Sequence, residues 1–294
     1  MRLASDPPPA VVIEIPSVEH PVLLRVLLDE ADSRNVPIRR VSQGGGLQLL
    51  TDAEVREMVA IANERGIELY LFVSTRNSFE PMVDADGRDE VVGESAFQDA
   101  IGELKRCRAV GVHGVLVADV GLLRVAGQMR AAGELGDLKI KTSVAIAPRN
   151  AAAAELYEEL GATSINLAGS ASVQDVAAMR ARLAPVTGID LYVESPDGLG
   201  GGLRYRHAAD FVEVAAPVSL KIGLRKMPDL YPYGAHLEPA AERSMREKAR
   251  RAELLLARLS AELGSARVAE LMGTDVGTRS AAGGPLANDA SDVS

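Results

Sequence analysis

Eight short β-rich runs of apolar residues alternate along the chain with stretches that carry apolar residues at helical spacing. Most runs start roughly 20 to 30 residues after the previous one, which suits a strand, a loop, a helix and a second loop. The expected strands are 11–15, 38–42, 67–74, 112–119, 139–144, 162–167, 189–194 and 218–222. Such alternation predicts a parallel sheet, and eight units without a strong dinucleotide-binding fingerprint predict an α/β fold closed into a single (β/α)8 TIM barrel.

The stretches between the strands carry helix start and stop signals. Thr51 and Glu54 form the Thr-x-x-Glu pattern of a capping box, and their helix is expected to end near Gly66. Further helices are expected at 94–110, 151–160, 173–183, 203–215 and, long and charged, 239–263. The barrel is thus predicted at 11–263, between a flexible start at 1–10 and a disordered, Gly-, Ala- and Ser-rich tail at 264–294. The long polar loop 75–93 is a candidate lid or substrate loop.

Charge and cysteine content exclude several kinds of partner. The chain has 41 acidic and 32 basic residues, a formal net charge of −9, whereas a nucleic-acid-binding face is normally basic. Its single cysteine, Cys107, rules out a disulfide within the chain and a cysteine-held iron–sulfur cluster. No apolar run approaches the ~18 residues of a membrane span, and residues 1–10 lack a signal-peptide core. We expect a cytoplasmic protein with a small-molecule substrate and no nucleic-acid or membrane partner, and a homo-oligomer stays open.

Strand parity separates the barrel interior from the face that the helices cover. Alternate residues of a strand point to opposite sides, and the helix-covered side must be apolar, so the polar set of each strand is expected to point inward. This rule predicts one interior ring, made of Glu14, Arg40, Ser42, Ser74, Asp119, Lys141, Ser143, Asn166, Glu194 and Lys221. Buried charges persist only when they are paired, solvated or used. The ring is either a network of ion pairs that fills the barrel or a catalytic mouth at the strand ends.

The residue types in the ring allow two kinds of chemistry. Lys221 or Lys141 could form a Schiff base with a carbonyl substrate, with Glu194 or Asp119 as a proton shuttle. Alternatively, the carboxylates of Glu14, Asp119 and Glu194 could hold a divalent cation such as Mg²⁺. No His-x-x-x-His or His-x-His spacing indicates zinc, and no Gly-x-Ser-x-Gly motif indicates a serine hydrolase.

Two glycine-rich segments follow strands, at 44–46 and 198–202. The second lies where barrels often bind phosphate, in the loops after the last two strands. The residues expected to hold an anionic substrate group there are Gly201, Gly202, Arg204 and Arg225. The alternative is that these glycines only permit tight turns.

The loop after the eighth strand contains the densest aromatic stretch of the chain, at 230–237. Its Tyr231, Tyr233 and His236 are candidates to cover the mouth of the barrel or to act as acid–base groups. Packing for shape alone is the other interpretation.

The sequences IELYLFV at 67–73, VGVHGVLVADVGLL at 110–123 and KIKTS at 139–143 are similar to segments of the collagenase-like peptidase family U32. The chain resembles this family over roughly 55–194. Asp119 begins the Asp-x-Gly-Leu-Leu segment after the fourth strand, and Glu194 corresponds to a family glutamate. The family's histidine and cysteines near the seventh strand are absent here, so its iron–sulfur roles do not carry over.

Three functions follow as hypotheses. The resemblance implies a hydrolase that cleaves an amide-like bond in a small polar or anionic substrate, with Glu194, Asp119 and Lys221 at the centre. The second is a lyase, aldolase or isomerase that uses Lys221 or Lys141 on a carboxylate- or phosphate-bearing substrate. The third is a barrel that binds a ligand without catalysis.

Overall fold

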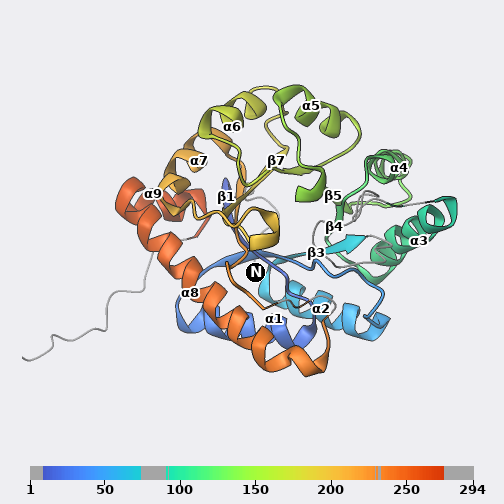
Figure 1. Cartoon of the computed structure of the whole chain (residues 1–294), viewed down its shortest axis with the longest axis horizontal. Coiled ribbons are helices and arrows are strands. Elements are labelled where there is room, and N and C mark those ends of the chain that lie inside the picture. Colours follow the sequence, from blue (N-terminus) through green and yellow to red (C-terminus); the bar gives the residue numbers. More distant parts are fainter. Residues whose placement is uncertain (1–8, 74–90, 92, 229, 231–232, 275–294) are drawn as a thin grey trace, which may run out of the picture.

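Eight parallel strands close into one barrel in the order β1 to β8 in the computed structural model, as the sequence predicted (Figure 1). The structure describes residues 9–73, 91, 93–228, 230 and 233–274. The strands are β1 Val11–Pro16, β2 Ile38–Ser42, β3 Glu68–Val73, β4 Gly114–Val117, β5 Lys139–Thr142, β6 Ser164–Asn166, β7 Gly188–Glu194 and β8 Val218–Ile222. Most of the candidate loop 75–93 and the start of the chain lie outside the described residues.

Helices surround the barrel in chain order, and α8 runs beside α1 where the last unit meets the first (Figure 1). The helices are α1 Pro21–Ser33, α2 Asp52–Arg65, α3 Glu94–Val110, α4 Val120–Ala131, α5 Ala151–Glu159, α6 Val173–Arg180, α7 Ala208–Ala215, α8 Glu238–Leu263 and α9 Ser265–Leu271. Short 3₁₀ turns are η1 Val144–Ile146, η2 Asp197–Leu199, η3 Tyr205–His207 and η4 Ala235–Leu237. None of the described helices is both long and apolar enough to span a membrane.

Local signals explain most helix boundaries. Thr51 and Glu54 form the predicted capping box of α2, and Gly66 ends that helix with a left-handed φ of 61°. The helix expected at 203–215 begins later, at 208, because Leu203 pairs with Glu194 in an antiparallel bridge and a 3₁₀ turn follows it.

A short helix, α9, lies at the start of the tail expected to be disordered. Its Val268 and the following Met272 are buried, so apolar packing against the barrel orders the chain beyond residue 264. Residues 275–294 lie outside the described part of the chain.

The apolar core lies between the sheet and the helices. Strand residues of one parity, such as Leu69, Val115 and Leu191, are fully buried against the helix ring. Residues of the other parity point into the barrel, and most of them are polar. This division agrees with the parity rule and leaves the barrel interior available for charged groups.

Helices α4 and α5 approach each other through glycine. A Cβ atom on Gly127 would lie 2.1 Å from the carbonyl oxygen of Leu160, which is backbone and cannot rotate away. We therefore expect Gly127→Ala to lower the free energy of unfolding by about 1–3 kcal/mol, measured by urea denaturation.

The matched control is Gly102, which lies inside α3, where an added Cβ would have nothing within 4 Å. Alanine there is expected to raise stability by about 0.5–1 kcal/mol, because alanine favours helix. Equal effects of the two substitutions would contradict the close α4–α5 contact.

Candidate active site

Side chains inside the barrel form layers of four, each contributed by alternate strands. The register of the strands places one layer from the odd-numbered strands between two layers from the even-numbered strands. The odd layer consists of Glu14, Tyr70, Lys141 and Asp190. The even layer toward the amino ends consists of Arg40, Gly114, Ser164 and Ser219, and that toward the carboxyl ends of Ser42, Leu116, Asn166 and Lys221.

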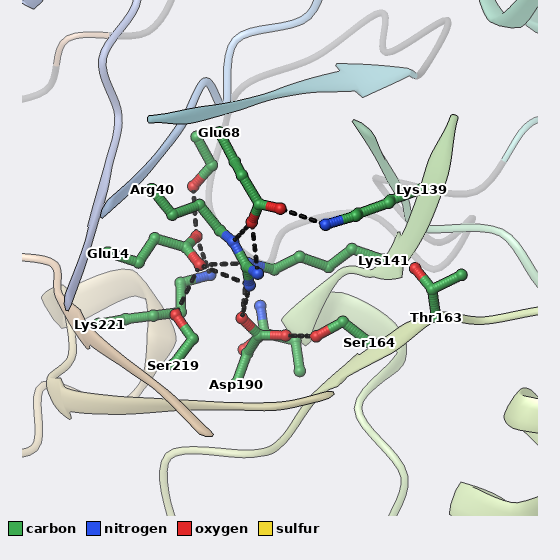
Figure 2. Close-up of polar contacts among 12 residues, drawn as sticks. Glu14, Arg40, Glu68, Lys139, Lys141, Thr163, Ser164, Asp190, Ser219 and Lys221 are labelled. Carbon is green, nitrogen blue, oxygen red and sulfur yellow. Dashed lines mark hydrogen bonds and ion pairs between the residues drawn. The ribbon is translucent and has the colours of Figure 1, made fainter. Parts of the chain in front are cut away.

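Glu14 is the centre of a buried ion-pair network (Figure 2). One of its oxygens, Oε2, accepts hydrogen bonds from Lys141 Nζ at 2.5 Å and from Ser219 Oγ at 2.9 Å. The other, Oε1, accepts from Ser42 Oγ at 2.7 Å and lies 3.4 Å from Lys221 Nζ. Burial alone would raise the pKa of Glu14, but the nearby cations outweigh it and hold that pKa well below its usual value.

Asp190 is the second buried carboxylate, and it was absent from the predicted ring. It lies 2.8 Å from Lys141 Nζ and 3.1 Å from Arg40 Nη1, and Ser164 Oγ donates a hydrogen bond to it. Its parity could have revealed it, because it stands two residues before Tyr192 on the same side of β7. Lys141 is therefore fixed between two carboxylates, which is the ion-pair filling that was one of the two interpretations of the ring.

A second pair closes the amino-terminal end of the barrel. Glu68 binds Arg40 at 2.7 Å and also accepts from Lys139, whose side chain is 46% exposed (Figure 2). Burial would raise the pKa of Glu68, but these two cations lower it to about 2. Neither Glu68 nor Lys139 was among the predicted site residues, since each lies at the first position of its strand.

The network is balanced in charge, but its cations are not equally paired. Three carboxylates face three cations: Glu14, Glu68 and Asp190 face Arg40, Lys141 and Lys221. Lys139, which also contacts Glu68, is half-exposed and lies at the rim. Among the described residues, Lys221 is the cation of this network with the weakest pairing, a single contact of 3.4 Å with Glu14.

Lys221 is the cation nearest the carboxyl ends of the strands. Its ammonium has a single ion pair with the described residues, the 3.4 Å contact with Glu14, and lies 4.5 Å from the ring centre of Tyr192. Burial raises the pKa of Tyr192, so this phenol stays neutral. Lys221 is only 1% exposed, yet it keeps donors that no described group uses.

Asn166 and Ser143 lie on the neighbouring strand ends. Asn166 is 1% exposed, and its Oδ1 has no hydrogen-bond partner among the described residues. A buried acceptor without a donor is costly, so it is a candidate for a substrate contact. Ser143 instead caps the turn η1, where its Oγ accepts from the Ala145 amide.

Glu194 does not point into the barrel, contrary to the parity prediction. The register of β7 against β8 shifts between Tyr192 and Glu194, and this bulge turns the side chain to the outside. Its carboxylate accepts from Tyr205 Oη at 2.7 Å and from the Arg225 amide at 2.9 Å, and Arg251 lies 3.8 Å away.

Asp119 caps a helix instead of joining the interior network. Strand β4 ends at Val117, and Asp119 becomes the N-cap of α4, where its Oδ1 accepts from the Leu122 amide at 2.6 Å. Glu14, Asp119 and Glu194 therefore do not converge as the Mg²⁺ hypothesis required. Within the described residues no cluster of three or more His, Cys, Asp or Glu could hold a metal ion.

The first glycine-rich segment binds an acid of the chain itself. The amides of Gly44 and Gly45 donate to the two oxygens of Glu19 at 2.9 and 2.8 Å. The oxygen and nitrogen of the Gln43 amide both bond to Gly46. Backbone amides in this loop are thus already occupied by a carboxylate.

The two arginines of the second glycine-rich segment differ in how they are paired. Arg225 donates to Asp197 Oδ1 at 2.8 Å, and Gly201, with a φ of 60°, packs beside that pair. Arg204 donates to the carbonyl oxygens of Gly169 and Ala171 and stacks over the Phe211 ring. Gly202 accepts through its carbonyl from the Ser195 amide. Arg225 is therefore already paired with an acid, whereas Arg204 has no carboxylate partner among the described residues, and its buried Nε and Nη2 have no hydrogen-bond partner there.

The aromatic segment contributes little to the described interior. His236 is exposed in η4, and Tyr233 packs near His20 with its hydroxyl 3.4 Å from Glu238. Ser74 and Tyr231, both predicted site residues, lie outside the described residues.

The chain is similar to known proteins in both sequence and fold. The sequence model of peptidase family U32 matches residues 46–194, and no curated protein matches significantly. The solved U32 peptidase Mk0906 is 16% identical with a TM-score of 0.46, covering 76% of this chain and 97% of its own. A proposed fructose-1,6-biphosphate aldolase from Coccidioides immitis is 10% identical, with a TM-score of 0.56 and coverage of 85% and 91%. A truncated 3-deoxy-D-arabino-heptulosonate 7-phosphate synthase from Thermotoga maritima is 12% identical, with a TM-score of 0.51 and coverage of 89% and 92%. These last two similarities show the barrel fold alone.

Proposed function

Since this chain belongs to peptidase family U32, we propose that it is an enzyme that binds a small anionic substrate above Lys221, at the carboxyl ends of the barrel strands. The observation that carries the proposal is the weak pairing of the buried Lys221 ammonium, whose single ion pair among the described residues is the 3.4 Å contact with Glu14. A weakly paired buried charge is costly, and a substrate carboxylate or phosphate would stabilise it. Asn166 would accept a hydrogen bond from the same substrate.

The reaction that the geometry favours is addition of the Lys221 amine to a substrate carbonyl. The Lys221 ammonium first gives a proton to water, and the free amine adds to the carbonyl carbon. The nitrogen then loses a second proton while the former carbonyl oxygen gains one, which gives a neutral carbinolamine. This carbinolamine takes up a proton from water and expels its hydroxyl as water, which leaves a protonated imine. A protonated imine keeps the positive charge at this position, so an adjacent carboxylate on the substrate remains paired with it. Lys141 is less suited, because Glu14 and Asp190 hold its ammonium and it is fully buried. The reaction class is therefore a lyase or aldolase acting on a carboxylate-bearing carbonyl compound.

Hydrolysis of an amide-like bond is the second candidate, and the family match favours it. It needs a base that activates water beside the substrate. Glu194 and Asp119 contact groups away from the interior, so Glu14 is the acid nearest to Lys221. The low pKa of Glu14 makes its carboxylate a weak base, which disfavours this mechanism.

Borohydride trapping distinguishes the two candidates. Incubation of the protein with a 2-oxo acid such as pyruvate or 2-oxobutyrate, followed by borohydride and peptide mass spectrometry, is expected to give a secondary amine adduct at Lys221. Lys221→Met should lose this adduct. Lys226→Met, which changes an exposed lysine of the next loop, should retain it.

An adduct confined to exposed lysines would contradict the imine mechanism. Hydrolysis of amide substrates without any Lys221 adduct would support the second candidate. Binding of the anion with neither adduct nor turnover would instead identify a non-catalytic barrel.

A further inference from the structure

Arg204 lies apart from the interior network, where the loops after β6 and β7 meet the start of α7. It follows Leu203, and its backbone amide donates to the Val193 carbonyl at 2.7 Å, which holds it beside the end of β7. Helices α6 and α7 are neighbours in the outer ring (Figure 1). The Arg204 side chain reaches from α7 toward α6, because its Nη1 donates to the carbonyl oxygens of Gly169 and Ala171 just before that helix.

The guanidinium of Arg204 is fixed at one end and over one face. Its contacts with the two carbonyls, at 3.0 and 2.6 Å, use both hydrogens of Nη1. The Phe211 ring of α7 stacks against the group, with Cζ of Arg204 4.3 Å from the ring centre. The orientation of this guanidinium is therefore set by the chain itself, and a ligand would not have to order it.

The remaining edge of the same guanidinium has no partner. Nε and Nη2 of Arg204 are both buried, and neither has a hydrogen-bond acceptor among the described residues. Burial lowers the pKa of Arg204, and no acid in the described part of the chain counteracts this effect. Buried charged donors are costly when they are left unpaired, so this edge requires an acceptor.

The shape and charge of the edge indicate which acceptor fits. Nε and Nη2 form one side of a planar fork, and their N–H bonds match two oxygens of a single carboxylate or phosphate. Arg204 contributes one positive charge, and Arg225 is already balanced by Asp197. A carboxylate balances one guanidinium, whereas a phosphate dianion would add a further negative charge to a chain whose net charge is −9.

The second glycine-rich segment lies beside Arg204 and has room to shift. A Cβ on Gly202 would be 4.0 Å from Arg204 Cγ. Residues 198–200 are exposed, and a Cβ on Gly198 or on Gly200 would meet nothing within 4 Å. A small ligand can therefore reach the guanidinium through a shift of this loop, without unpacking the core.

We propose that Arg204 is the centre of a carboxylate-binding site separate from the interior network, with Nε and Nη2 each donating to one oxygen of the ligand. The carbonyls of Gly169 and Ala171 and the ring of Phe211 hold the guanidinium ready for it. The site selects carboxylates over neutral amides, which offer a single oxygen. It does not depend on the proposed reaction of Lys221.

The Nε–H signal of Arg204 provides the test, because this bond belongs to the unpaired edge. The full chain is titrated with sodium acetate, and the arginine Nε–H groups are followed by ¹H–¹⁵N NMR. We expect one Nε–H signal to shift until it saturates. Sodium chloride at the same ionic strength and neutral acetamide should not reproduce this shift, and inorganic phosphate should bind more weakly than acetate.

Variants assign the signal and locate the binding. Arg204→Lys removes the signal and keeps the positive charge but loses the fork, so acetate should bind about tenfold more weakly, as followed through the backbone amides of 169–171. Arg206→Lys, which changes an exposed arginine two residues later, should keep the wild-type affinity. If Arg204→Lys does not fold, Phe211→Leu, which removes the stacking ring and keeps the guanidinium, should weaken acetate binding a few-fold.

Three results would overturn the site. A response that does not saturate, or that chloride reproduces, would mean that water alone occupies the edge. An unchanged acetate affinity in Arg204→Lys would place the binding elsewhere, and tighter binding of phosphate would overturn the choice of carboxylate. Lys221→Met should leave the Arg204 shift intact, so failure of the proposed function and failure of this site are separate outcomes.

Discussion

Glutamine in place of Glu14 is expected to lower the free energy of unfolding by about 3–5 kcal/mol. The carboxylate is fully buried and accepts hydrogen bonds from Ser42, Lys141 and Ser219. The neutral amide keeps the volume of the side chain but removes the charge. Asp190 and Glu68 would then face the three cations Arg40, Lys141 and Lys221, and one buried positive charge would have no carboxylate to balance it.

Guanidinium denaturation at pH 7 measures this loss, with Glu68→Gln as the control. Glu68 lies at the amino-terminal rim with its side chain 27% exposed, so its loss should cost about 1 kcal/mol. The pKa of Glu14 is depressed by folding, so its contribution is complete above the ordinary value of 4.5 and declines as the pH falls toward the folded-state value. Similar losses in both variants would mean that the interior network is not a low-dielectric site.

The fold was predictable from the sequence because its signals are local and repeated. Each signal can be recognised within a few residues of sequence, as with the alternating strand and helix periods, the Thr51–Glu54 capping box and the Gly66 helix end. Eight repetitions outweigh errors at single boundaries. The predicted end of β4 was wrong, because the strand ends at Val117 and not at 119. A polar residue at position 119 fits the strand pattern and fits a helix N-cap equally well, and Asp119 is the N-cap of α4.

The site was predictable only as far as strand parity holds. Parity correctly brought Glu14, Lys141 and Lys221 together across strands that are far apart in sequence. It failed at Glu194, because a bulge between hydrogen-bonded strands depends on the partner strand and leaves no mark on the β7 sequence itself. Whether Asn166 Oδ1 has a hydrogen-bond donor depends on the atoms that surround it in the folded chain, so no pattern in the sequence reveals it.

Lys248 is a buried lysine that the sequence assigned only to a long charged helix. It lies on α8 at 0% exposure, and its Nζ donates to the Pro16 carbonyl at 2.6 Å, near the end of β1. Burial lowers its pKa to about 7, and the carboxylate of Glu19 only partly counteracts that effect. Folding therefore favours the neutral amine, whereas an unfolded chain binds the proton up to about pH 10.5.

Between pH 7 and 10 the unfolded state holds more protons at Lys248 than the folded state, so this residue makes stability rise with pH. Its contribution is complete above pH 10.5 and is lost as the pH falls to about 7. Relative to Lys248→Met, the wild-type free energy of unfolding should therefore gain roughly 1.4 kcal/mol per pH unit between pH 7.5 and 9.5. Urea denaturation at four pH values measures this slope. Lys105→Met, which changes an exposed lysine on α3, should follow the wild type in parallel. A wild-type curve parallel to that of Lys248→Met would mean that the ammonium is solvated or paired in the folded protein.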